Sequence, residues 1–133
     1  MSSATAVVAA HGALADGLVS AVDAITGRGA VLRAVSNAGL SLAGVMQAIG
    51  DALDTTGARI VFTDLPAGSC TLAARKLQRD RADLVLVIGV NLPMLLEFVM
   101  REGEPGTTAP ARASAAADRG REHIRVLEAN RGG

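Results

Sequence analysis

Four short, largely apolar runs recur along the chain, and they constrain its fold more than any other feature. They span residues 4–10, 30–35, 59–63 and 84–88. Strands with one face in water alternate apolar and polar residues, whereas runs that are apolar throughout are typical of strands buried on both faces of a parallel sheet. The pattern predicts an α/β, doubly wound domain: a mainly parallel four-stranded sheet with helices on both faces and right-handed crossovers.

Helices are expected in the segments between these runs. The first has apolar residues at helical spacing from Leu14 to Ile25 and ends at Gly27. The second begins after the N-cap candidate Ser41 and ends at Gly57. Shorter helices are predicted over residues 72–77, 93–100 and 111–118.

The C-terminal third of the chain is predicted to add one more element to the sheet. Residues 102–110 are rich in Gly, Pro and Thr, and we expect a loop or linker there. Glu122–Glu128 fits a strand or a helix, and we expect a strand, because one more edge strand would stabilise a sheet this small. We treat residues 1–133 as one domain, since half of the residues are hydrophobic and a chain of this length can bury one core.

Charge and composition exclude several classes of function. The formal net charge is zero and only two residues are aromatic, so the basic, aromatic-rich face of a nucleic-acid-binding protein is not expected. The single cysteine, Cys70, can form no internal disulfide, which fits a reducing compartment. Neither a signal-peptide pattern nor an apolar run long enough to span a membrane is present in the sequence, and we expect a cytoplasmic protein.

Three residue types with complementary chemistry follow the predicted strands. His11 follows the first strand, and Asp64 follows the third and precedes the Gly68-Ser69 turn. The second strand ends near Ser36 and Asn37. Because the carboxyl ends of parallel strands share one edge of a sheet, we expect these side chains to meet there.

This combination is suited to phosphoryl transfer. A neutral imidazole is a nucleophile toward phosphorus, and a carboxylate that accepts its other N–H, here Asp64, orients the ring and stabilises its charge. The hydroxyl of Ser69 and the free N–H groups of the helix that starts there can bind phosphoryl oxygens. Gly12 and Gly68 allow close approach of the backbone, and with Cys70 they are predicted to line the phosphate site.

Each of these residues also has a purely structural interpretation. His11 fits a histidine that only forms structural hydrogen bonds, and Gly68-Ser69 fits an ordinary helix start. Asp64 fits a turn or cap residue, and Asn91-Leu92-Pro93 fits a turn before a helix. Cys70 lies near a helix N-terminus, where a thiol can be a nucleophile, although a small packed side chain is the simpler interpretation. His123 has Arg neighbours and is expected on the surface.

Several segments resemble the IIA domains of the mannose family of sugar phosphotransferase systems (PTS EIIA type-4). The segments VAAHG and LADGL at residues 8–12 and 14–18 are similar to the active-site segment of that family. DLPAGS at residues 64–69 resembles its second loop, D-x-x-G-G-S-P, and GVNLPMLLE at residues 89–97 resembles its G-V-N-[LI]-P-M-L motif. GRE at residues 120–122 is similar to the start of its final segment, so the resemblance spans nearly the whole chain.

The resemblance implies a phosphotransferase whose His11 receives phosphate from the carrier HPr and passes it to a histidine of a IIB component. It implies that Asp64 is the carboxylate beside the histidine and Ser69 the serine beside the phosphoryl group. Asn91, Leu92 and Pro93 are expected on the partner-contacting surface, and the membrane components IIC and IID would be reached only indirectly. It also implies a homodimer in which a strand at residues 120–129 completes the partner's sheet. No metal or cofactor is implied.

The second loop departs from the family pattern at three positions, where Ala67, Cys70 and Leu72 replace Gly, Pro and Asn. The first change makes the loop less flexible and the others alter the rim that partners touch. Three other functions therefore stay open: a phosphocarrier for a dihydroxyacetone kinase, a regulatory module controlled by phosphorylation, and a domain that only binds small anions.

Overall fold

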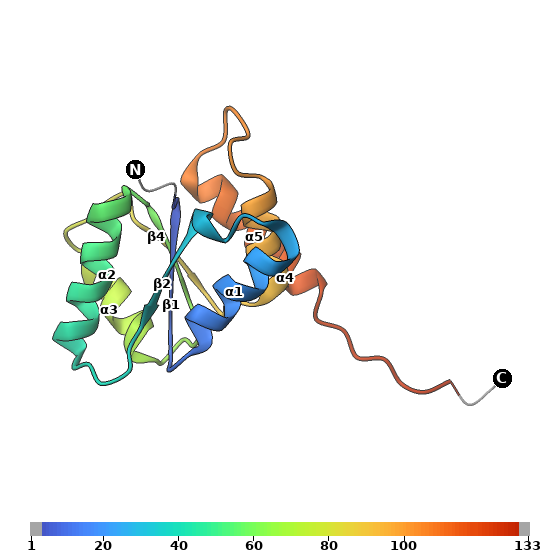
Figure 1. Cartoon of the computed structure of the whole chain (residues 1–133), viewed down its shortest axis with the longest axis horizontal. Coiled ribbons are helices and arrows are strands. Elements are labelled where there is room, and N and C mark those ends of the chain that lie inside the picture. The colour runs from blue at the N-terminus through green and yellow to red at the C-terminus, as the bar shows by residue number, and fades with distance from the viewer. Residues whose placement is uncertain (1–3, 131–133) are drawn as a thin grey trace.

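A computed structural model describes residues 4–130, which form a parallel sheet between two layers of helices (Figure 1). The strands are β1 (Ala6–Ala10), β2 (Leu32–Ser36), β3 (Ile60–Thr63) and β4 (Val85–Ile88). The helices are α1 (Leu14–Thr26), α2 (Leu42–Thr56), α3 (Ser69–Leu77), α4 (Leu92–Met100) and α5 (Ala109–Glu122), and a 3-10 turn covers Gly29–Val31. The doubly wound α/β fold expected from the sequence is confirmed.

The strand order is β2-β1-β3-β4, and every pair of neighbouring strands is parallel. In this register Ala9 of β1 lies between Val35 of β2 and Thr63 of β3. The chain passes from β1 to β2 on one side and then returns to β3 on the other. The point where the direction of winding changes, which is where such sheets bind ligands, therefore lies between the carboxyl ends of β1 and β3.

The sheet separates two apolar cores. Alternate residues of β1 point to opposite faces, so Val8 packs on the side of α1, α4 and α5, and Val7 packs on the side of α2 and α3. The first core holds both aromatic side chains, Phe62 and Phe98, edge to face at a centroid distance of 5.3 Å. The second is built from aliphatic and small side chains, among them Ile49 and Leu53. Each large side chain buried this way contributes about 1.5–3 kcal/mol to the free energy of folding.

The helix starts follow local sequence. Ser41 caps α2, since its side chain accepts a hydrogen bond from the Gly44 N–H, and Gly27 and Gly57 end α1 and α2 in the left-handed conformation. Thr108 caps α5 in the same manner as Ser41. In the described part of the chain, no helix has both the length and the apolar character that crossing a bilayer demands.

The C-terminal region differs from the sequence-based expectation. Helix α5 is longer at both ends than residues 111–118, and it contains Glu122, where we expected a strand to begin. Residues 124–130 have no regular secondary structure and extend away from the domain (Figure 1). The prediction of a strand at Glu122–Glu128 is therefore wrong for the single chain.

The physical reason lies in how α5 packs on α4. Gly120 carries no Cβ, and an added Cβ would lie 2.9 Å from Met94 Cε and 3.0 Å from Asn91 Oδ1. Asn91 Nδ2 also donates a hydrogen bond to the Gly120 carbonyl at 3.1 Å. These contacts hold α5 in helical conformation as far as Glu122, the residue at which the strand was expected to begin.

Candidate phosphoryl-transfer site

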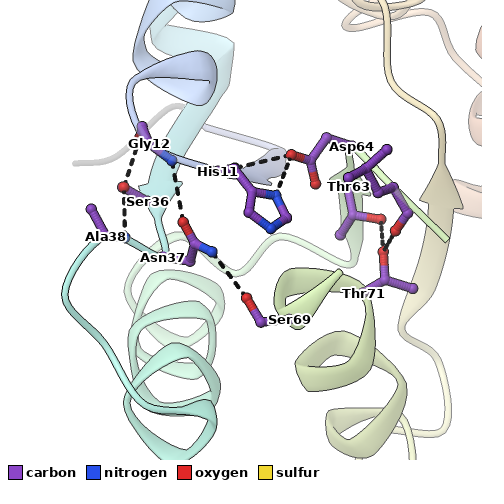
Figure 2. Close-up of polar contacts among 10 residues, drawn as sticks. His11, Gly12, Ser36, Asn37, Ala38, Thr63, Asp64, Ser69 and Thr71 are labelled. Atoms are coloured by element: carbon purple, nitrogen blue, oxygen red, sulfur yellow. Dashed lines mark hydrogen bonds and ion pairs between the residues drawn. The ribbon is translucent and has the colours of Figure 1, made fainter. Parts of the chain in front are cut away.

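The candidate site lies at the carboxyl edge of the sheet, where His11 directly follows β1 and Asp64 directly follows β3 (Figure 2). Asp64 Oδ2 accepts two hydrogen bonds from His11, one from the ring Nδ1 at 2.7 Å and one from the backbone N–H at 3.0 Å. Gly12, with φ of +57°, then turns the chain toward α1. The predicted pairing of His11 with Asp64 is thus present in the geometry.

The environment keeps Asp64 ionised. Its side chain is only 8% exposed, and burial alone would raise its pKa. The hydrogen bonds from the His11 backbone and ring outweigh this effect and hold the pKa of Asp64 below its ordinary value. The carboxylate is therefore available as an acceptor over the whole physiological pH range.

This pairing determines which ring nitrogen of His11 can react. An ionised carboxylate can only accept hydrogen bonds, so Nδ1 carries the hydrogen that faces Asp64. In the neutral ring the lone pair is then on Nε2. The His11 side chain is 46% exposed, so a reactant can reach this nitrogen.

The N-terminus of α3 lies against the same ring. A Cβ added to Gly68 would lie 2.8 Å from His11 Cε1 and 3.6 Å from Nε2, so only glycine allows this approach. Ser69 is the first residue of α3, and the N–H groups of a first helical turn have no helical partner. The positive end of the helix dipole therefore faces the reactive side of His11.

Two threonines fix α3 relative to β3. The buried Thr71 hydroxyl contacts the Thr63 hydroxyl at 2.7 Å and the Leu65 carbonyl. These bonds join the end of β3, the loop that carries Asp64 and the first turn of α3 (Figure 2). Neither threonine stands out in the sequence, because their pairing depends on how the helix folds back onto the strand.

Asn37 joins two parts of the site that are remote in sequence. Its Oδ1 accepts the Gly12 N–H at 3.2 Å, and its Nδ2 donates to Ser69 Oγ at 3.0 Å (Figure 2). The neighbouring Ser36 hydroxyl donates to the Gly12 carbonyl at 2.7 Å and accepts the Ala38 N–H. Gly12 was predicted to line the phosphate site, and its N–H is engaged by Asn37.

Cys70, the third residue predicted to line the phosphate site, has a buried side chain in the aliphatic core. Burial, with the charge of Asp64 as a smaller cause, raises the pKa of its thiol to about 11, although a hydrogen bond from Ser69 opposes the shift. The nucleophile interpretation of this cysteine is therefore wrong. Only the backbone N–H of Cys70, in the first turn of α3, remains for an anion.

The residues Asn91, Leu92 and Pro93 begin α4 and are half-buried. Asn91 Oδ1 accepts the Met94 N–H at 3.0 Å, so this side chain caps α4 as well as holding α5. His123 is exposed just beyond α5, as expected. Within residues 4–130, no group of three His, Cys, Asp or Glu side chains is arranged to hold a metal ion.

The chain is similar to known proteins in sequence and in fold. The family model EIIA-man, described as PTS system fructose IIA component, matches residues 5–114. No curated protein matches the sequence. The phosphotransferase system component EIIA from Streptococcus agalactiae superposes with a TM-score of 0.80 and 23% identity, over 92% of this chain and 95% of that one. The mannose/sorbose-specific IIA subunit from Enterococcus faecalis gives 0.79 and 18%, over 96% of each chain.

Proposed function

Since the chain belongs to the EIIA-man family, the PTS system fructose IIA component, we propose that it is a phosphocarrier of a sugar phosphotransferase system. It accepts a phosphoryl group from phosphorylated HPr on Nε2 of His11 and passes it to a histidine of a IIB component. It acts in the cytoplasm, and the sugar and the membrane components IIC and IID do not contact it directly. The observation that carries this proposal is the hydrogen bond of 2.7 Å that holds the His11 ring with Nε2 outward.

The transfer exchanges one nitrogen–phosphorus bond for another. The lone pair on Nε2 of His11 attacks phosphorus, and the bond between phosphorus and the donor's histidine breaks with its electron pair staying on the donor. The His11 ring keeps its Nδ1 hydrogen and becomes positively charged, and the nearby Asp64 carboxylate stabilises that charge. The same steps in reverse deliver the group to the acceptor.

The phosphoryl oxygens are bound by the start of α3. The Ser69 hydroxyl and the N–H groups of the first turn, including that of Cys70, are the available donors, and Gly68 lets them approach the ring. Phosphoryl transfer requires mainly positioning and charge stabilisation from a protein, which this arrangement supplies.

Exposed leucines around this edge form the surface on which HPr and IIB would dock in turn. Leu14 follows the His11 turn, Leu40 lies in the loop after β2, Leu65 follows Asp64, and Leu72 lies one turn beyond Ser69. Four exposed leucines in segments that carry site residues are suited to a transient protein contact. The proposed surface extends to the residues that follow the neighbouring strand β4, namely Asn91, Leu92 and Pro93.

We further propose that the protein is a dimer in which C-terminal segments are exchanged. The outer edge of β4 has no neighbouring strand in the described chain, and with α5 it lines a groove of about 280 Å³. Residues 124–130 place Ile124, Val126 and Leu127 in solvent at 74%, 89% and 88% exposure. An open strand edge and an exposed apolar segment in one chain complement each other across two copies.

The test is phosphotransfer in a purified system. Incubation with Enzyme I, HPr and phosphoenolpyruvate should add acid-labile, base-stable phosphate to the protein. The His11→Ala variant should not be labelled, whereas His123→Ala, which removes the other histidine, should be labelled like the natural protein. Equal labelling of His11→Ala would overturn the proposal.

A second stage identifies the acceptor. Labelled protein is offered separately to a IIB component and to the subunits of a dihydroxyacetone kinase, and the loss of label is followed. Transfer of the label to IIB supports the sugar system, and transfer to the kinase supports the related carrier. Retention of the label in the presence of either acceptor supports a regulatory module.

A further inference from the structure

We propose that Asn37 is a positioning residue that aims the Ser69 hydroxyl at the phosphoryl group carried by His11. This inference rests on the proposed function and deepens it, because it assigns a role to a residue outside the histidine–aspartate pair. The amide of Asn37 links the Gly12 turn to Ser69, because it forms a hydrogen bond with each of them (Figure 2).

The orientation of the amide follows from its partners. The backbone N–H of Gly12 can only donate, so the atom that faces it at 3.2 Å is the carbonyl oxygen of Asn37. The amide nitrogen must then face Ser69 Oγ, which lies 3.0 Å away. An amide NH₂ group can only donate, and Ser69 Oγ is therefore the acceptor in this bond.

The direction of this bond leaves the single hydroxyl hydrogen of Ser69 for another acceptor. A phosphoryl oxygen is charged, and it binds a hydroxyl donor more strongly than a neutral acceptor does. A phosphoryl group on Nε2 would lie at the start of α3, because Gly68 closely adjoins that side of the ring.

Ser36 provides a matched comparison within the same loop. Its hydroxyl bonds to the Gly12 carbonyl and the Ala38 N–H, so it supports the loop as Asn37 does but bonds to neither Ser69 nor His11. If Asn37 had a purely structural role, replacing it or replacing Ser36 would have the same effect on phosphorylation of His11. A positioning role predicts that only Asn37 affects the chemistry at His11.

The experiment uses phosphoramidate, a small-molecule donor, so that its outcome does not depend on any protein partner. The phosphorus–nitrogen bond of phosphoramidate breaks, ammonia leaves, and the new bond forms at Nε2. Phosphorus NMR follows the rate for the natural protein and for Asn37→Ala, Ser69→Ala, Ser36→Ala and the Asn37→Ala/Ser69→Ala double variant. The His11→Ala variant measures the background from His123, and urea unfolding measures the stability of each protein.

We expect Asn37→Ala and Ser69→Ala each to slow phosphorylation of His11 roughly 10- to 100-fold, the size typical for one lost hydrogen bond to a charged group. The double variant should be no slower than Ser69→Ala alone, because Asn37 acts through Ser69. The titration midpoint of the phosphoryl group should move to higher pH in Asn37→Ala, since a donor that favours the dianion has been lost. Ser36→Ala should lower the free energy of unfolding and leave the phosphorylation rate and the titration midpoint unchanged.

An unchanged rate of phosphorylation in Asn37→Ala would overturn the inference, and so would equal slowing by this change with and without the Ser69 hydroxyl. A slow rate in Ser36→Ala that matches Asn37→Ala would also do so. If phosphoramidate labels His11 but phosphorylated HPr does not, the proposed function fails while the role of Asn37 is still measured.

Discussion

Nδ1 of His11 lies 2.7 Å from Oδ2 of Asp64, although 53 residues separate them in sequence. The two residues are brought together because β1 and β3 are neighbouring parallel strands with Ala9 opposite Thr63. Each residue follows its strand directly, so the register of the sheet sets the distance between imidazole and carboxylate. The reactive pair is thus a direct product of strand order.

Replacing Asp64 with asparagine tests the charge of this pair. The carbonyl oxygen of asparagine can accept both His11 hydrogens, so the geometry is kept while the negative charge is removed. Hydrogen bonds to charged groups contribute about 1.5–3 kcal/mol, and each 1.4 kcal/mol is tenfold, so Asp64→Asn should slow phosphorylation roughly 10- to 100-fold. Stopped-flow transfer from phosphorylated HPr measures the rate, and an unaltered rate would contradict the role assigned to Asp64.

Acid should destabilise the fold through the same carboxylate. The folded-state pKa of Asp64 is lowered, so its contribution to the free energy of unfolding is fully present above the unfolded pKa of about 3.9 and is lost as the pH falls through the folded pKa. The difference in stability between the natural protein and Asp64→Asn should therefore shrink below about pH 4. Urea unfolding at a series of pH values measures it, and a difference independent of pH would contradict this account.

Gly68→Ala should slow the phosphorylation of His11 while having little effect on the free energy of unfolding. Its backbone, with φ of −83°, accommodates alanine, but the new Cβ would lie 2.8 Å from His11 Cε1 and would displace the ring. We expect at least a tenfold slower phosphorylation, since a displaced ring also loses the charged hydrogen bond to Asp64.

Gly50→Ala is the matched control for this change. In the interior of α2 the added methyl group meets Arg81 and Leu77 at ordinary contact distances of 3.5 and 3.9 Å. It should raise stability by about 1 kcal/mol and leave phosphorylation unchanged. An unaffected rate in Gly68→Ala would show that the ring position tolerates the extra carbon.

The Cys70 thiol should be unreactive in the folded protein. It is buried and its pKa is raised to about 11, so almost no thiolate is present or accessible at pH 8. Ellman's reagent should react with it quickly in 6 M guanidinium and at a rate limited by unfolding in buffer. Fast labelling of the folded protein would contradict the buried position.

Removal of residues 124–133 should convert the proposed dimer into a folded monomer. Helix α5 ends at Glu122, so the truncation leaves every helix and strand of the described chain intact. Sedimentation velocity should show a dimer for the full chain and a monomer for the truncated one, with thermal unfolding still cooperative. Val126→Asp tests the same contact without shortening the chain, and a truncated protein that still dimerises would exclude the exchange.

Much of the fold could be predicted because each strand carries its own signal. Residues 6–10 are apolar throughout because both faces of β1 are buried in the centre of the sheet, and β4 has the same apolar signal although it is only partly buried at the sheet edge. The placement of His11, Asp64 and Ser69 at one edge then followed from the general rule for parallel strands.

Other features depend on contacts that no local pattern encodes. The helical conformation of residues 119–122 depends on the packing of Gly120 against Met94 of α4 and against Asn91, the N-cap of that helix. The sequence places Asn37 at the end of a strand, but its role depends on the hydrogen bonds that it forms with Gly12 and Ser69, which belong to two other segments. The sequence places Cys70 near the N-terminus of α3, yet only the packing of α3 shows that its side chain points into the core.

The uneven composition of the two cores has a practical consequence for spectroscopy. The chain contains no tryptophan or tyrosine, and both phenylalanines lie on the side of the sheet covered by α1, α4 and α5. Near-ultraviolet circular dichroism will therefore report on the packing of that layer and give no signal from the aliphatic layer beneath α2 and α3. The single thiol, that of Cys70, lies in the aliphatic layer. Comparing the rate of thiol labelling with the loss of the phenylalanine signal would reveal whether the two layers unfold together or in sequence.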